Sequence, residues 1–214
     1  MTDFPAPDKR TLRRRLRARR QALTPEQQQH AADAIGQRLR RLPTWVRSRH
    51  IALYWPNNGE VDPRLLAESV WRSGKHCYLP VLHPTQPRRL WFVEWLPGAA
   101  LTPNRFGIPE PDPHVFRRMP ARFLNVVLTP LVGFDRDGGR LGMGGGFYDC
   151  TFAFKNREAL QGKGRRGPEL IGLAHACQEV PALPCEPWDV PVGTVITDQE
   201  LLVSCSTTAG RESS

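Results

Sequence analysis

The stretch RLGMGGGFYD at residues 140–149 brings together residue types that can do chemistry. Four glycines fall within residues 142–146, with Arg140 before them and Asp149 after them. Glycine loses more conformational freedom on folding than any other residue, so this cluster requires a structural or functional reason. A turn needs one or two glycines, and a linker would not lie between an apolar strand-like segment and a helical pattern. A loop whose backbone N–H groups hold phosphate at the start of a helix is therefore favoured.

Two familiar phosphate-binding motifs do not fit this loop. A Walker-type loop ends in Gly-Lys-Ser or Gly-Lys-Thr, whereas this loop ends in Gly146 and Phe147. The dinucleotide fingerprint GxGxxG also fails. Counted from Gly142, its third glycine falls on Phe147, and counted from Gly144 it falls on Asp149. The pattern therefore predicts a third type of nucleotide-binding loop.

Asp149 has two interpretations. An acid directly after a phosphate-binding loop repels the phosphate unless a cation lies between them. Mg²⁺ is commonly held by one or two carboxylates together with phosphate oxygens, so Asp149 fits a magnesium ligand. Asp is also a favoured residue at the amino terminus of a helix, so Asp149 fits an N-cap equally well. The local pattern leaves both interpretations open.

The basic run KRTLRRRLRARR at residues 9–20 holds eight of the chain's 30 lysines and arginines and no acid. The rest of the chain is close to neutral, so the net charge of +9 is local to one end. Such a run indicates either a nucleic-acid-binding helix or a helix that supplies a few phosphate-binding cations. The nucleic-acid class is disfavoured, because no aromatic residue that could stack on bases lies within the run.

Hydrophobic periodicity predicts helices that alternate with short apolar strands. Helices are expected at residues 8–22, 25–42, 62–75 and 147–160, and strands at residues 50–55, 76–82, 89–95, 123–134, 170–176 and 192–197. Thr24 and Gln27 form a capping box, and Pro25 suits the first helical position. Strands separated by helices indicate an α/β fold with a largely parallel sheet.

The chain has 214 residues, which is enough to bury one sizeable core. We expect a flexible amino terminus at residues 1–7, a single domain at 8–200 and a polar carboxyl-terminal tail at 201–214. No apolar run approaches the roughly 20 residues that cross a bilayer, and the start lacks the apolar core of a secretory signal. Five cysteines without a metal-binding spacing indicate reduced thiols. We therefore expect a cytoplasmic protein without a membrane partner, and we expect a monomer.

The segment TPLVGFDRDGGRLGMGGGFYD at residues 129–149 resembles the signature of the 5-formyltetrahydrofolate cyclo-ligase (5,10-methenyltetrahydrofolate synthetase) family. Five further segments fit the family in order and spacing, namely KRTLR at 9–13, GEVD at 59–62, LPVLHP at 79–84, FGIPEP at 106–111 and WDVPVGTVIT at 188–197. The resemblance implies a single-domain, three-layer α/β sandwich with a largely parallel sheet flanked by helices. It implies an ATP- and Mg²⁺-dependent ligase that converts 5-formyltetrahydrofolate into 5,10-methenyltetrahydrofolate. The implied route passes through a phosphorylated N5-formyl intermediate and releases ADP and phosphate.

The same resemblance implies a set of site residues. Arg140 and Tyr148 are implied as catalytic residues, and Asp149 and Asp189 as magnesium ligands. The nucleotide is expected to contact Lys9, Arg10, Arg13, Arg140, Leu141, Gly142, Gly144, Gly145, Gly146 and Tyr148. The small-molecule folate substrate, with or without a polyglutamate tail, is expected to contact Glu60, Phe106, Met143 and Phe147. A nucleic-acid partner is not expected.

Within the basic run, Lys9 and Arg13 match the family's phosphate-contacting positions and lie one helical turn apart, on one face of the helix. The neighbouring Arg17 and Arg20 are predicted to be solvated.

The sequence leads to further expectations for Phe106 and Gly145. Phe106 lies in a proline-rich segment, where packing in the core is favoured over holding a substrate ring. Gly145 occupies a position at which some family members carry lysine. Without that lysine, Arg140, Lys9 and Arg13 are expected to neutralise more of the phosphate charge.

Overall fold

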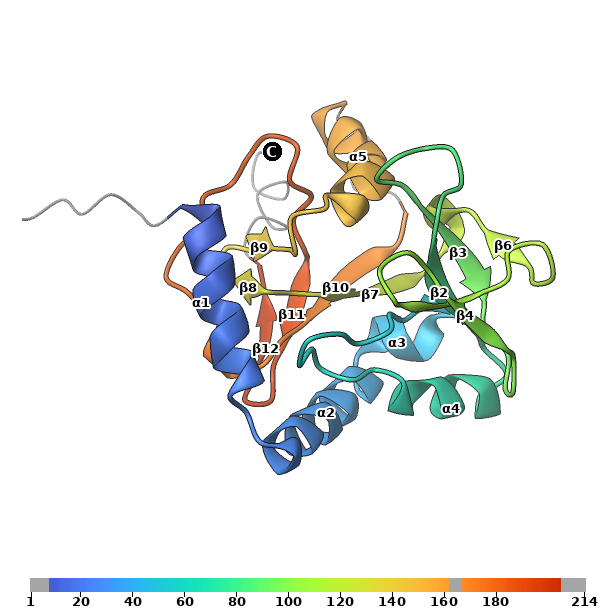
Figure 1. Ribbon diagram of the computed structural model, residues 1–214, viewed down its shortest axis with the longest axis horizontal. Helices are drawn as coiled ribbons and strands as arrows, with labels where there is room; N and C mark the ends of the chain where they lie inside the picture. The colour runs from blue at the N-terminus through green and yellow to red at the C-terminus, as the bar shows by residue number, and fades with distance from the viewer. Residues whose placement is uncertain (1–7, 162–166, 205–214) are drawn as a thin grey trace, which may run out of the picture.

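The computed structural model describes residues 8–161 and 167–204 (Figure 1). The predicted flexible amino terminus at residues 1–7 lies outside the described residues, as do residues 205–214 of the predicted tail. In the described part of the chain, no helix combines the length and apolarity that a membrane span requires.

One eight-stranded sheet forms the centre of the molecule, in the order β12-β11-β10-β7-β1-β2-β3-β6. Its strands are β1 (His50–Ala52), β2 (His76–Leu82), β3 (Leu90–Glu94), β6 (Arg118–Met119), β7 (Val126–Pro130), β10 (Glu169–Leu173), β11 (Thr194–Ile196) and β12 (Leu201–Val203). The five central strands, from β11 to β2, pair in parallel, and the strands outside them pair antiparallel. The predicted α/β fold with a largely parallel sheet is confirmed.

Two small ribbons accompany the sheet. The first pairs β4 (Leu101–Pro103) with β5 (Pro109–Pro111), and the second pairs β8 (Gly133–Phe134) with β9 (Arg140–Leu141). The second ribbon leads directly into the glycine loop.

The helices are α1 (Lys9–Gln21), α2 (Pro25–Arg40), α3 (Pro43–Arg47), α4 (Leu65–Arg72) and α5 (Phe147–Leu160), with 3-10 turns η1 (Ala121–Phe123) and η2 (Ala176–Gln178). The predicted capping box of Thr24 and Gln27 is present at the start of α2. The helix predicted from residue 62 begins instead at Leu65, because the Asp62 carboxylate accepts the backbone N–H of Arg64 in a turn before it.

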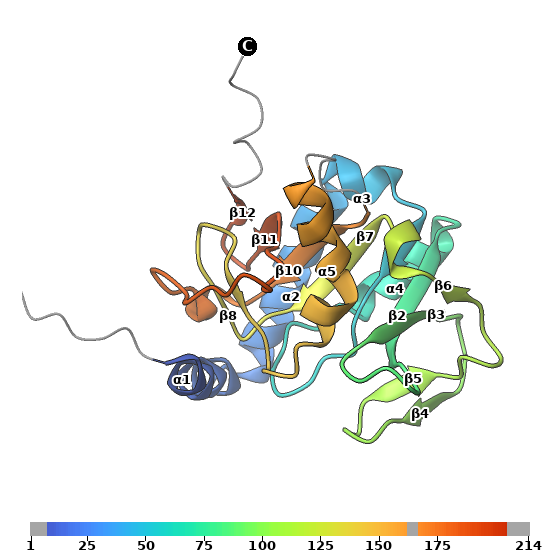
Figure 2. The same cartoon turned by 90° about the horizontal axis from the view of Figure 1, so that it is seen from above.

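Helices cover both faces of the sheet, which gives three layers (Figures 1 and 2). Alternation along the strands decides which side chain meets which layer. Ile51 and Cys77 face α2, α3 and α4, whereas the intervening Ala52 and Tyr78 belong to the cluster that contains Phe152 of α5. Helix α1 lies apart from these layers and packs Leu12 and Leu16 against Val132, Leu141 and Leu183.

The sheet extends beyond the domain boundary predicted at residue 200. Leu201–Val203 form β12, which pairs antiparallel with β11 as an edge strand. The predicted polar tail at 201–214 therefore starts too early, because three apolar residues at its beginning complete the sheet.

The order of the strands creates a switch point between β1 and β7. The chain runs from β1 to β2 on one side and later returns to β7 on the other side of β1. The loops that follow β1 and β7 therefore diverge from neighbouring carboxyl ends of the sheet. In open α/β sheets, ligands bind in the crevice that such diverging loops leave.

Candidate active site

The glycine loop ends at the amino terminus of α5. Gly144 and Gly146 have positive φ angles of +99° and +67°, so both need a residue without a Cβ. Gly146 is the N-cap of α5, and among the described residues no side chain caps this helix end. The loop therefore presents a helix amino terminus to the crevice, which is a favourable place for an anion.

The other two loop glycines differ from these. A Cβ on Gly145 would lie 2.8 Å from the ring of Phe147, whereas a Cβ on Gly142 would meet nothing among the described residues within 4 Å. The Phe147 ring thus occupies the space beside Gly145, and a side chain at this position would have to displace it.

Helix α1 supplies two cations to the site. The Arg13 Nε donates a hydrogen bond of 2.8 Å to the Gly142 carbonyl, which holds the guanidinium along the loop. The Lys9 Nζ lies 2.9 Å from Asp189 Oδ2 and 3.9 Å from Glu186. The structure therefore brings Lys9, Arg13, Asp189 and the glycine loop together.

Arg140 and Asp149 form a second ion pair at the start of α5. The side chain of Arg140 is almost fully buried, and its Nη2 donates to Asp149 Oδ1. The Arg140 Nε donates to the Val190 carbonyl at 2.7 Å, and the Val190 N–H donates to Asp149 Oδ1 at 3.0 Å. Because Gly146 is the N-cap and Asp149 lies in the first turn, the N-cap interpretation of Asp149 is wrong.

The two predicted magnesium ligands, Asp149 and Asp189, have the same pattern of hydrogen bonds. Asp149 Oδ1 accepts both of its hydrogen bonds, and Asp189 Oδ2 accepts from both Lys9 and the Glu186 N–H. Among the described residues, nothing contacts Asp149 Oδ2 or Asp189 Oδ1 by a hydrogen bond. One oxygen of each acid therefore has no hydrogen bond to a described residue, and a carboxylate oxygen is the type of ligand that Mg²⁺ takes. The described residues include no cluster of three or more metal-ligating side chains.

Glu60 lies in the loop that follows β1. Its side chain is 7% exposed, and its Oε1 lies 3.5 Å from Arg20 Nη2. Burial raises the pKa of Glu60 to about 7, although the positive charge of Arg20 opposes this shift. Glu60 therefore changes its charge near neutral pH.

Arg20 corrects a prediction. It was expected to be solvated, yet it is completely buried. The reason is helical spacing: Leu12, Leu16 and Arg20 follow one another at four-residue intervals and share the inner face of α1. That spacing was a signal available in the sequence. Arg17 is also less solvated than expected, because its Nε is buried without a hydrogen-bond partner among the described residues.

Tyr148 lies in the first turn of α5, and its ring stacks on Phe152 with the centroids 6.3 Å apart. Burial raises the pKa of the Tyr148 hydroxyl, the charge of Glu60 raises it further, and Arg140 opposes both effects. The phenol therefore remains protonated at neutral pH and can donate a hydrogen bond.

Two aromatic side chains meet at the tip of the β4–β5 ribbon. Phe106 and Phe147 form an edge-to-face pair with centroids 6.0 Å apart. Phe106 is 53% exposed, so the expectation that it packs in the core is wrong. Asn104 holds the tip, because its Oδ1 accepts the N–H of Phe106 and its amide donates to Glu110. Phe106 is thus presented on the surface beside the start of α5.

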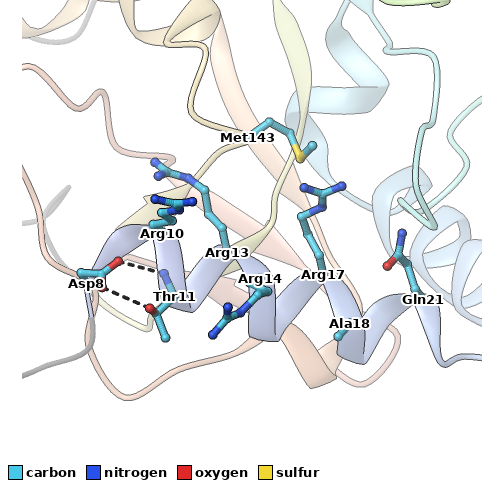
Figure 3. Close-up of a pocket in the computed structure, with 9 residues that line it drawn as sticks. All are labelled: Asp8, Arg10, Thr11, Arg13, Arg14, Arg17, Ala18, Gln21 and Met143. Atoms are coloured by element: carbon cyan, nitrogen blue, oxygen red, sulfur yellow. Dashed lines mark hydrogen bonds between the residues drawn. The ribbon is translucent and has the colours of Figure 1, made fainter.

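The side chains of Met143 and Leu141 do not face the glycine loop in the same way: one borders an open cavity and the other is buried. Met143 extends over an open cavity of about 820 Å³ on α1, which Arg10, Arg13 and Arg17 also line (Figure 3). The side chain of Leu141 is buried against α1, so only its main chain is available to a ligand.

The chain is similar to known proteins over most of its length. Residues 5–198 match the 5-formyltetrahydrofolate cyclo-ligase family. The 5-formyltetrahydrofolate cyclo-ligase of Escherichia coli (strain K12) is 42% identical over 186 residues, which cover 87% of this chain and 98% of that protein. The protein of the same name from Haemophilus influenzae is 39% identical, over 86% of this chain and 95% of its own. The NMR structure of 5,10-methenyltetrahydrofolate synthetase from Aquifex aeolicus matches with a TM-score of 0.78 and 28% identity, covering 96% of both chains.

Proposed function

This chain belongs to the 5-formyltetrahydrofolate cyclo-ligase family and is an enzyme of that type, and we propose that it closes the ring of 5-formyltetrahydrofolate with ATP and Mg²⁺. The products are 5,10-methenyltetrahydrofolate, ADP and phosphate. One observation carries the proposal: the glycine loop and the buried Glu60 lie on the two loops that diverge at the switch point, and Arg13 of α1 contacts the glycine loop.

Phosphoryl transfer asks a protein mainly for positioning and for neutralisation of charge. Lys9 and Arg13 of α1 and Arg140 of β9 supply three cations around the loop. The N–H groups at the start of α5 add a partial positive charge where the phosphates would lie. Asp149 and Asp189 would hold Mg²⁺, which neutralises phosphate charge when it is bound.

The folate side of the site contains an acceptor and two rings. An ionised Glu60 accepts hydrogen bonds from the N–H edge of the pterin. Phe106 and Phe147 offer apolar ring surfaces at the exposed end of the site. The protonated Tyr148 donates a hydrogen bond that orients the formyl group.

The reaction then proceeds in two steps. The N5-formyl oxygen attacks the γ-phosphorus of ATP, which forms an O–P bond and releases ADP. N10 attacks the activated formyl carbon, the carbon–oxygen bond to the phosphate breaks, and N10 loses its proton. Arg140 stabilises the charge on the transferred phosphoryl group during both steps.

The direct test combines the protein with 5-formyltetrahydrofolate and Mg·ATP and follows the absorbance of the methenyl product. We expect absorbance to rise in step with ADP release. A folded protein that produces neither contradicts the proposed function.

A series along α1 distinguishes this function from nucleic-acid binding. Lys9→Ala and Arg13→Ala should each lower kcat/KM for ATP by about tenfold or more, because each removes a charge-assisted phosphate contact. Arg15→Ala, on the exposed side of α1, should have little effect. A nucleic-acid-binding helix would instead lose affinity by similar steps at all three positions and become less sensitive to salt.

A further inference from the structure

Arg20 makes an extensive set of contacts for a residue with no exposed surface. Its Nε donates to the Asn58 carbonyl at 2.8 Å, and its Nη1 donates to the Leu131 carbonyl at 3.0 Å. Its Nη2 donates to the Asn57 carbonyl at 3.4 Å and lies 3.5 Å from the Glu60 carboxylate. Arginine is almost never fully buried unless it is paired. Here every partner belongs to a loop at the switch point.

The first of these loops presents Glu60. Residues 57–60 form a tight turn in which the Glu60 N–H donates to the Asn57 carbonyl, and Glu60 Oε2 accepts the Asn57 N–H. Asn58 and Gly59 have positive φ angles of 52° and 75°. Asn followed by Gly is the pair that adopts two successive positive φ angles most readily, so the sequence favours a tight turn here. The two carbonyls that Arg20 binds are part of this turn, so Arg20 fixes the direction of the Glu60 side chain.

The second loop leads to the nucleotide side of the site. Leu131 directly follows β7, and its carbonyl also accepts a hydrogen bond of 2.5 Å from Gln178. The chain continues from Leu131 into the ribbon that carries Arg140 and the glycine loop. Arg20 therefore joins α1 to two loops: the turn of Glu60, where it makes three of its four side-chain contacts, and the first residue after β7.

We propose that Arg20 is a positioning residue for the folate substrate: its guanidinium keeps the Glu60 carboxylate ionised and aimed at the pterin, without touching the substrate. The inference rests on the proposed function, because it takes Glu60 as the acid that binds the folate. An ionised Glu60 accepts hydrogen bonds from pterin N–H groups, whereas a protonated carboxyl would present a donor to them.

The surroundings of Glu60 make Arg20 the main charge that favours ionisation. Among the described residues, the charged and titratable groups that face Glu60 are Arg17 and Arg20 of α1, Tyr54 after β1 and Tyr148 of α5. The His175 ring also contacts the neighbouring Gly59 carbonyl, and burial lowers the pKa of His175, so this ring is neutral at neutral pH. Both phenols have a raised pKa and stay neutral. Burial already raises the pKa of Glu60 to about 7, and Arg20 opposes this more strongly than Arg17 does. Removal of Arg20 should therefore leave Glu60 protonated at neutral pH.

The kinetic test uses Arg20→Met, Arg20→Lys and the exposed control Arg15→Met. At about pH 7.5, Arg20→Met should raise KM for 5-formyltetrahydrofolate about tenfold or more, while KM for ATP changes by less than about threefold. The acidic limb of the profile of kcat/KM for folate against pH should move to higher pH. Arg20→Lys keeps the positive charge, so the acidic limb of its pH profile should stay near the wild-type position. Arg15→Met should behave as the wild type.

A second measurement does not depend on activity. In protein labelled with ¹³C at glutamate carboxyls, NMR follows the titration of Glu60, whose signal is assigned from its loss in Glu60→Gln. The Glu60 titration should move upward by about one pH unit or more in Arg20→Met. The wild type could prove inactive while the Glu60 titration still moves upward in Arg20→Met. That result counts against the proposed function but not against the effect of Arg20 on Glu60. A folded Arg20→Met with unchanged Glu60 titration and unchanged KM for folate overturns the role of Arg20.

If circular dichroism shows that Arg20→Met does not fold, Arg20→Lys carries the test in a double-mutant cycle with Glu60→Gln. The lysine lacks the planar guanidinium, so it should raise KM for folate in the wild-type background. It should have little further effect once Glu60 is replaced, because both changes act on the same carboxylate. Independent, additive effects overturn the inference.

Discussion

At the scale of single residues, the site is built from charges that already have partners. Arg140 with Asp149, and Lys9 with Asp189, pair a predicted phosphate-binding cation with a predicted magnesium-binding acid. Such pairs contribute little net stability, because desolvation offsets the attraction where they are buried and solvent screens it where they are exposed. These pairs hold the side chains in place while leaving one oxygen on each acid, so we interpret them as preorganisation of the site.

The magnesium assignment makes a prediction for Asp149. Asp149→Asn preserves the shape of the side chain and keeps an oxygen that accepts the Val190 N–H, so the fold should be retained. Loss of the charge should lower kcat/KM for Mg·ATP by about tenfold or more, most strongly at limiting Mg²⁺. Steady-state kinetics across a magnesium titration measure this effect, with circular dichroism as the control for folding. Normal turnover at limiting Mg²⁺ would show that Asp149 is not a ligand.

The raised pKa of Glu60 predicts how stability depends on pH. The folded-state pKa of about 7 lies above the ordinary value of 4.5. The stabilising contribution of the protonated carboxyl is therefore complete below about pH 4.5 and is lost as the pH rises through 7. Relative to Glu60→Gln, the wild type should lose about 2 to 3 kcal/mol of unfolding free energy between about pH 5 and pH 8.

Urea unfolding of both proteins across this pH range measures the difference. If the unfolding free energies of the wild type and Glu60→Gln change in parallel with pH, Glu60 titrates at its ordinary pKa. Glu60→Gln should also bind folate weakly. Glu60 would then favour substrate binding at the expense of the stability of the fold.

At the scale of elements, the glycine loop and α5 act together. Gly144→Val and Gly146→Val place a β-branched residue at a positive φ, which distorts the loop. Both should lower the affinity for Mg·ATP by about a hundredfold or more, because the N–H groups at the start of α5 would no longer face the phosphates. Equilibrium binding of a fluorescent ATP analogue measures the loss, and circular dichroism confirms the fold.

Gly142→Ala is the matched control for the fold. Its backbone has no positive φ, and a Cβ there meets no described atom within 4 Å. This variant should keep the stability of the wild type. A folded Gly144→Val that binds ATP with wild-type affinity would contradict the phosphate-binding role of the loop.

At the scale of the whole molecule, the site joins segments that are far apart in sequence, from α1 to the loop that contains Asp189. A ligand that contacts all of them should therefore stabilise the entire fold. Mg·ATP at about a hundred times its Kd should add about 2.7 kcal/mol and raise Tm by about 5 to 10 °C. Differential scanning fluorimetry measures this shift.

Removal of the metal tests the same linkage. EDTA should abolish most of the increase in Tm, and Asp149→Asn should show little increase at the same nucleotide concentration. An equal increase with ATP in the presence of EDTA would mean that the metal does not contribute to nucleotide binding.

Features that depend on short-range patterns can be predicted from the amino-acid sequence. Hydrophobic periodicity predicted the α/β sheet, Thr24 and Gln27 predicted the start of α2, and the glycine cluster predicted a loop at the start of a helix. These features depend on residues within one or two turns of each other, so their physical causes are visible in a local stretch of chain.

The burial of charged side chains and the identity of their partners depend on contacts between distant segments of the folded chain. Asp149 accepts the N–H of Val190, which is 41 positions away, and Arg20 binds carbonyls 37 to 111 positions away. Phe106, in the loop of the β4–β5 ribbon, contacts Phe147 at the start of α5, although its local sequence favoured the core. Desolvation and long-range pairing depend on which segments the sheet brings together at its switch point. The charge state of Glu60 and the role of Arg20 therefore follow from the folded molecule and not from their neighbours in sequence.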